Sequence, residues 1–165
     1  MKGDGFMLSK PEYEWSKFSL GKGTWDLSYL TNVPLDWLDN AIWGMKNFEP
    51  FTVKAECEPG DLLCTVDHAY CYIIFQDWDE KAQEKISFEW YPLTMLEFCQ
   101  QLVQDISTHL DDWSRYPCGC DLREPEEEKA AAWEKKQLEK KLKQLKRLIR
   151  IRKKYTNPAI LGRNQ

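Results

Sequence analysis

The chain has 165 residues, of which 42% are hydrophobic, and its 23 basic and 27 acidic side chains give a formal net charge of −4. This length suits one well-formed domain with some chain left over, and the composition excludes collagen-like and largely disordered chains. The longest uncharged apolar run, from Ala69 to Phe75, is far shorter than the roughly 20 residues that a membrane-spanning helix requires.

The charge is unevenly distributed along the chain. Residues 1–123 hold 10 basic and 21 acidic side chains, a net charge of −11, whereas residues 124–165 hold 13 basic and 6 acidic side chains, a net charge of +7. We therefore expect an acidic α+β domain over residues 1–123 and a basic amphipathic helical tail over residues 124–165. The start of the chain lacks the apolar core of a signal peptide, so we expect a cytoplasmic protein with reduced cysteines.

The first part of the chain alternates between strand and helix patterns. Gly21-Lys22-Gly23 separates Glu14–Leu20 from Thr24–Leu30, and the apolar alternation around this break predicts an N-terminal β-hairpin. Val33-Pro34 predicts the start of a helix, because proline suits the first helical turn. Apolar residues then recur at spacings of three and four, which places one face of this helix against the core: Leu35, Leu38, Ile42 and Met45.

Four alternating segments predict a four-stranded antiparallel meander: Phe51–Glu58, Leu62–Val66, Ala69–Gln76 and Ile86–Tyr91. Pro59-Gly60 provides the first turn, with glycine accepting a positive backbone angle. Both alternating sets of Ala69–Gln76 are apolar or aromatic, so we expect a central strand that is covered on both faces. A two-residue turn at Asp67-His68 would place Cys64 opposite Cys71.

Thr94 and Glu97 form a capping-box pattern that predicts a second helix start. Apolar residues at spacings of three and four extend this helix for some twenty residues, to Trp113. The fold class that follows is α+β: an antiparallel sheet, made of the N-terminal hairpin and the meander, packed with two helices and followed by a long charged C-terminal helix.

The C-terminal segment is predicted to be one long helix, with acidic residues after Pro125 and basic residues at its far end, which complements the helix dipole. An apolar seam follows a heptad spacing: Leu138, Leu142, Leu145 and Ile149. The seam favours docking on the body or pairing with another copy in a coiled coil. The basic face leaves open nucleic acid, a membrane surface or a separate protein partner, although the acidic body argues against a nucleic-acid partner because it repels phosphate.

The residues offer little catalytic chemistry. His68 and His109 are the only histidines, and the cysteine spacings do not match paired zinc knuckles, although a redox or metal role stays open for Cys118 and Cys120. Gly21-Lys22-Gly23-Thr24 lacks the spacing of a phosphate-binding loop. We therefore expect no enzyme, no catalytic residues, no metal and no cofactor.

The clearest candidate binding surface is acidic. Glu97, Asp105 and Asp112 fall on one stripe of the second helix, and Asp111 adjoins it. Such a stripe is either simply solvated or steers a basic protein partner toward the body. Trp37 and Trp43 are candidate aromatic anchors beside it.

Three segments resemble small cytoplasmic bacterial proteins of the toxin-neutralising, immunity type: Thr24–Leu30, Pro34–Leu38 and Phe98–Trp113. The resemblance extends over roughly two-thirds of the chain and implies a compact α+β domain whose acidic surface blocks a basic, often nuclease, toxin. The leading hypothesis is therefore a non-enzymatic protein-binding module. The alternatives are an assembly protein that oligomerises through its C-terminal helix and a nucleic-acid-associated protein that uses its basic tail.

Overall fold

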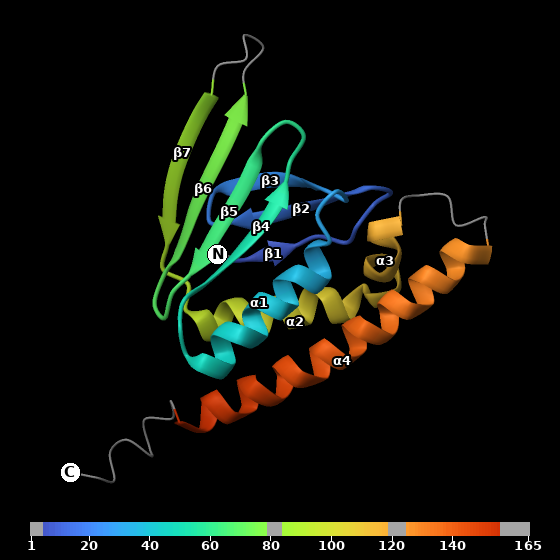
Figure 1. The fold of residues 1–165 in the computed structure, drawn as a ribbon. Helices are drawn as coiled ribbons and strands as arrows, with labels where there is room; N and C mark the ends of the chain where they lie inside the picture. Colours follow the sequence, from blue (N-terminus) through green and yellow to red (C-terminus); the bar gives the residue numbers. More distant parts are fainter. Residues whose placement is uncertain (1–4, 79–83, 119–124, 156–165) are drawn as a thin grey trace.

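The computed structural model describes residues 5–78, 84–118 and 125–155 (Figure 1). The strands are β1 (Met7–Leu8), β2 (Trp15–Leu20), β3 (Gly23–Ser28), β4 (Phe51–Glu56), β5 (Asp61–Val66), β6 (Cys71–Trp78) and β7 (Glu84–Tyr91). The helices are α1 (Val33–Asn47), α2 (Met95–Thr108), α3 (Leu110–Arg115) and α4 (Pro125–Tyr155), and a 3-10 turn spans Tyr116–Cys118. This architecture confirms the predicted α+β class.

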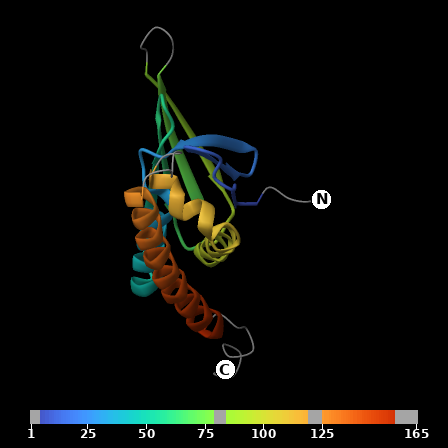
Figure 2. The same ribbon diagram turned by 90° about the vertical axis from the view of Figure 1, so that its right-hand side faces the viewer.

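The strands form two antiparallel sheets. The N-terminal sheet has the order β1-β2-β3 and contains the predicted hairpin, and the second sheet is the predicted meander, β4-β5-β6-β7. Figures 1 and 2 show α1 and α2 beneath the strands, with α4 crossing the helices on their far side. Helix α4 packs on α1, α2 and α3. No helix in the described ranges has the length and apolar character needed to cross a bilayer.

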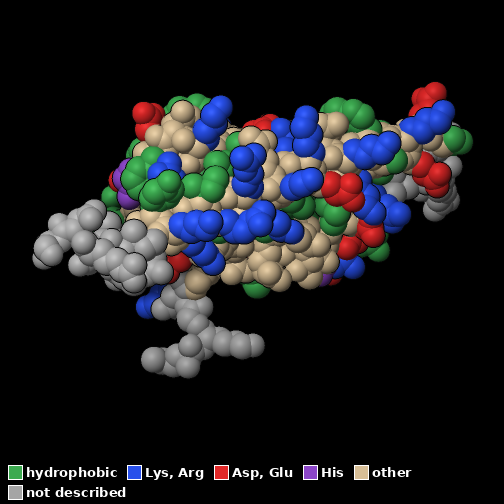
Figure 3. Space-filling model, turned by 90° about the horizontal axis from the view of Figure 1, so that it is seen from below, with side chains coloured by type: hydrophobic (Ala, Val, Ile, Leu, Met, Phe, Trp, Pro, Cys, Tyr) green, Lys and Arg blue, Asp and Glu red, His purple; other side chains and the backbone are tan. Residues whose placement is uncertain are grey.

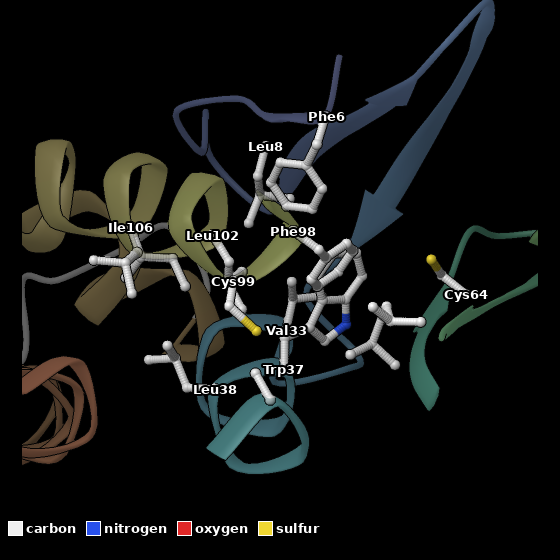
Figure 4. Packing of buried hydrophobic residues seen from close by; sticks show 14 of the residues in the cluster. Phe6, Leu8, Val33, Trp37, Leu38, Cys64, Phe98, Cys99, Leu102 and Ile106 are labelled. Atoms are coloured by element: carbon white, nitrogen blue, oxygen red, sulfur yellow. The ribbon is translucent and has the colours of Figure 1, made fainter. Parts of the chain in front are cut away.

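The core lies between the sheets and the first two helices. Trp37 of α1 is its centre, with Phe18 packed edge-on at 5.2 Å between ring centroids and Phe98 stacked at 6.4 Å. Figure 4 shows Trp37 surrounded by buried side chains from both helices and both sheets. Its indole Nε1 donates to the Lys54 carbonyl oxygen at 2.7 Å, so the one polar atom of the ring is also satisfied.

The meander differs from the prediction in two respects. The β5–β6 turn is closed by Asp67 and Tyr70, so Cys64 lies opposite Ile73 rather than Cys71. Strand β6 is covered on one face only, because Cys71 and Ile73 are buried whereas Ile74 on the other face is exposed. The helices all lie on the inner side of this sheet, which leaves nothing in the described chain to cover its outer side.

The second predicted helix begins as expected but ends early. Thr94 and Glu97 form a complete capping box. The helix is interrupted at His109, whose backbone angles of −123° and 40° are not helical, so that α2 and α3 are separate. The interruption lets Trp113 pack against Tyr116, whose hydroxyl donates to the Leu27 carbonyl oxygen at 3.1 Å. The predicted single helix to Trp113 is therefore wrong at His109, although the apolar periodicity of the sequence continues through this residue.

The C-terminal helix docks on its own body. The residues of its seam, Leu138, Leu142, Leu145 and Ile149, are buried in the same hydrophobic core as the body. Polar contacts with α1 fix the helix along its length. Asn32 donates to Glu134 at 2.7 Å, Lys141 donates to Asp39, and Arg152 donates to the Met45 carbonyl oxygen at 2.9 Å.

Candidate functional site

The acidic stripe is used within the molecule at its α2 end. Glu97 accepts hydrogen bonds from the backbone and hydroxyl of Thr94, at 2.9 and 2.7 Å, and these bonds lower the pKa of its carboxyl group. Asp105 accepts from the Leu8 backbone at 2.7 Å and from Gln101 at 2.8 Å, while burial raises the pKa of its carboxyl group. Both carboxylates therefore stabilise the fold. Glu97 caps the start of α2, and Asp105 links β1 to α2.

The other two carboxylates of the predicted stripe belong to α3. Asp111 forms an ion pair with Lys135 of α4 at 2.8 Å, and Asp112 lies 3.7 Å from the ammonium group of Lys10. All four predicted acidic residues thus have partners inside the chain. The structure does not gather them into one free acidic surface, because the break at His109 places two of them on a separate helix.

The two predicted tryptophan anchors differ sharply. Trp37 has no exposed surface, and the prediction that it is available to a partner is wrong, because it fills the centre of the core. Trp43, six residues later on α1, is 49% exposed. Only Trp43 of this pair is available for contact with another molecule.

The most unusual surface of the described chain is the outer side of β6 and β7, which we call the outer sheet face. Its members are aromatic or aliphatic side chains that project away from the helices: Tyr70, Tyr72, Ile74, Ile86, Phe88 and Trp90. The strand register pairs Tyr72 with Trp90 and Ile74 with Phe88. These side chains therefore form two adjacent rows, not scattered single residues.

The rings of the outer sheet face contact one another. Tyr72 stacks on Phe88 with centroids 6.3 Å apart and an interplanar angle of 20°, and Tyr70 meets Trp90 edge-on at 5.4 Å. Ile86, Phe88 and Trp90 are nevertheless 66%, 60% and 57% exposed. Each aromatic side chain of this size has about 150–250 Å² of surface that it can bury, so the face exposes roughly 500 Å² of apolar surface. That is near the upper end for a monomer, where such patches are often functional.

The meander that carries the outer sheet face is acidic in sequence. Residues 51–91, which form the meander and its turns, hold nine acidic and three basic side chains, a net charge of −6. Glu56 and Asp61 are exposed at the β4–β5 end of the same side of the sheet, and Lys54 is the described cation on that side. The sheet thus combines exposed rings with carboxylates, two groups that attract cations.

Sequence reasoning missed the outer sheet face although its signal was present. Ile86, Phe88 and Trp90 alternate with polar residues, as on a strand with one apolar side. The error was to assume that both apolar sides of β6 were covered. The sequence predicts two helices in the body, and both pack on the inner side of the sheet. No predicted element of the body therefore remains to cover the outer side.

The thiols and imidazoles do not assemble into a reactive site among the described residues. Cys57, Cys64, Cys71 and Cys99 are free thiols, and burial raises the pKa of Cys57 to about 12 and that of Cys64 well above its ordinary value. His68 packs its ring against Phe48 at 4.3 Å. No cluster with metal-ligand composition occurs in the part of the chain that the structure covers. The side chain of Cys118 and all of Cys120 lie outside the described residues.

Comparison with known proteins assigns no relative to this chain: no protein-family model matches it, and no match is found among curated proteins or solved structures.

Proposed function

We propose that this chain is a non-enzymatic protein-binding module and that a basic protein partner docks on the outer sheet face. The observation that carries the proposal is the exposure of Phe88 and Trp90, at 60% and 57%, in a continuous aromatic surface. Leaving rings of this size in water costs free energy that a partner would recover on binding. Aromatic residues near the centre of an interface are also the residues that most often dominate its affinity.

The charge and chemistry of the surface favour a basic partner. Arginine and lysine side chains bind over aromatic rings, with about 0.5–2 kcal/mol per contact, and they pair with carboxylates beside the ring. The net charge of −6 over residues 51–91 and of −11 over residues 1–123 would speed the approach of a cationic protein. An inhibitor that blocks a basic toxin, as the family resemblance implies, is one protein of this kind.

Two other surfaces are less suited to this role. Glu97, Asp105, Asp111 and Asp112 already have partners within the chain, so a protein binding there would compete with existing contacts. The seam of α4 is buried on the body, so oligomerisation through it would require the helix to detach and expose core residues such as Leu138 and Leu145. Binding at the outer sheet face requires neither the loss of existing contacts nor the detachment of α4.

A paired capture experiment tests the proposal. The full chain and the double variant Phe88→Ala/Trp90→Ala are immobilised, and lysate of the source organism is passed over both. Trp43→Ala is the matched control, since Trp43 is 49% exposed but lies on α1. We expect a basic protein, identified by mass spectrometry, to be retained by the wild type and the control, lost by the double variant, and released as salt is raised.

Three results would contradict the proposal. One is capture of an acidic partner, the second is equal loss of the partner in the Trp43→Ala control, and the third is retention by the double variant. Circular dichroism and thermal melting of each variant show that loss of capture does not reflect unfolding. A concentration-dependent dimer of the wild type that the double variant abolishes would assign the surface to a second copy of the chain instead.

A further inference from the structure

Helix α4 carries a line of cations on the side opposite its buried seam, which we call the basic stripe. Its members are Lys129, Lys136, Lys140, Lys143, Arg147, Arg150 and Lys154, all of them exposed. From Lys136 onward they recur at steps of four and three residues, so they lie on one face of the helix. Figure 3 shows basic side chains in rows across the underside of the molecule, where α4 runs. At 1.5 Å per residue, the stripe is about 37 Å long.

Within the described part of the chain, no ion pair is formed by the basic stripe, whereas three other cations of α4 have partners on the body. Lys135, Lys141 and Arg152 bind Asp111, Asp39 and the Met45 carbonyl oxygen, respectively. Within the described ranges, no ion pair joins a stripe residue to a carboxylate, and Glu139 is the one acidic side chain between Lys129 and Lys154 on the exposed side of the helix. Contacts with the body therefore do not explain this row of like charges, whose members repel one another.

A polyanion is the ligand that such a row fits, and the packing of α4 favours nucleic acid over lipid. A basic amphipathic helix binds a membrane by inserting its apolar face, but the apolar face of α4 is buried in the core. The exposed rings on this helix, Trp133 at 58% and Tyr155 at 69%, stand near the two ends of the stripe and are 22 positions apart. Isolated rings beside a line of cations suit base stacking along a flexible strand.

The acidic body weakens this binding without preventing it. The stripe faces away from α1 and α2, on which the opposite side of the helix packs. Charges farther than about 8 Å are largely screened at physiological ionic strength. We propose that the basic stripe binds the phosphate backbone of single-stranded nucleic acid, independently of the outer sheet face and at the other side of the molecule.

Fluorescence anisotropy with a labelled oligothymidylate of about 20 nucleotides tests this proposal on the full chain at about 50 and 200 mM salt. The stripe variant is Lys140→Gln/Lys143→Gln/Arg147→Gln. The matched control is Lys22→Gln/Lys46→Gln/Lys54→Gln, which removes three exposed cations from other surfaces and changes the net charge equally. We expect the stripe variant to bind at least about tenfold more weakly than the wild type. The dependence of the log association constant on log salt should also become less steep by about 2, at roughly 0.7 per lost phosphate contact.

The control should bind within about twofold of the wild type, since its lysines are not in the stripe. The variant Phe88→Ala/Trp90→Ala should also bind normally, which separates this site from the proposed protein-docking surface. No binding by the wild type at the lower salt concentration, or equal losses in the stripe variant and the control, would overturn the proposal. So would wild-type binding to vesicles containing phosphatidylserine without binding to the oligonucleotide.

Discussion

The two faces of strand β6 have similar apolar chemistry but opposite environments. Ile73 and Ile74 are consecutive residues of β6, and they are 1% and 40% exposed. The inner face is covered by α1 and the core around Trp37, whereas the outer face has no covering element in the described chain. An apolar strand pattern therefore indicates that a surface favours burial. Whether that surface is buried depends on how the other elements pack against it.

The largest expected contrast is between two tryptophans. Trp37→Ala removes a fully buried ring and its hydrogen bond to Lys54, so it should lower the free energy of unfolding by about 3–5 kcal/mol. Trp90→Ala removes an exposed ring and should change it by less than about 1 kcal/mol. Urea denaturation of both variants measures the difference. A large loss of stability in Trp90→Ala would mean that the outer sheet face is structural.

The neighbouring isoleucines provide a more closely matched pair. Ile73→Ala should cost about 2–5 kcal/mol, because it leaves a cavity on the inner face. Ile74→Ala should cost about 1 kcal/mol or less, because its side chain is partly in water. Equal costs in denaturant titrations would contradict the assignment of the two faces.

Thiol chemistry distinguishes the faces without removing core atoms. Cys64 is fully buried and burial raises its pKa, so it should react slowly with iodoacetamide in the folded protein. Thr65→Cys places a thiol on the next residue, which faces outward, and should react at least about a hundredfold faster. Peptide mapping after timed labelling measures both rates in one sample. Rapid labelling of Cys64 would indicate that the inner face opens.

The smallest expected effect on stability concerns Glu134, a buried carboxylate of α4. The six residues of the outer sheet face include no carboxylate. Burial raises the pKa of Glu134, the acceptor for Asn32, so ionisation opposes folding there. Its contribution is most favourable below its unfolded pKa, near 4.3, and declines as the pH rises through its folded pKa. Glu134→Gln keeps an acceptor for Asn32 and should be at least as stable as the wild type at pH 7, with the gain disappearing below about pH 4.

Thermal melts of the wild type and Glu134→Gln across this pH range measure the gain. A variant that is less stable at pH 7 would show that attraction to Lys141 outweighs the cost of burying the charge.

Local patterns predicted the elements, and tertiary packing decided their environments. The alternation in Phe51–Glu58 gave β4, and Thr94 with Glu97 gave the start of α2, because both signals lie within a few residues. The break after α2 at His109 occurs together with a hydrogen bond from Tyr116 to Leu27, a contact over 89 residues of sequence that no local pattern encodes. Trp37 and Trp43 look alike in sequence, but only the position of α1 against the sheets makes one buried and the other exposed.

Footprinting of the outer sheet face in a complex tests the central claim most directly. The captured basic partner is mixed with the full chain, and hydroxyl-radical oxidation of each aromatic residue is compared with that of the free protein. We expect strong protection of Phe88 and Trp90 and unchanged oxidation of Trp43. Protection of Trp43 with Phe88 and Trp90 still fully oxidised would contradict this claim and would place the binding surface on α1.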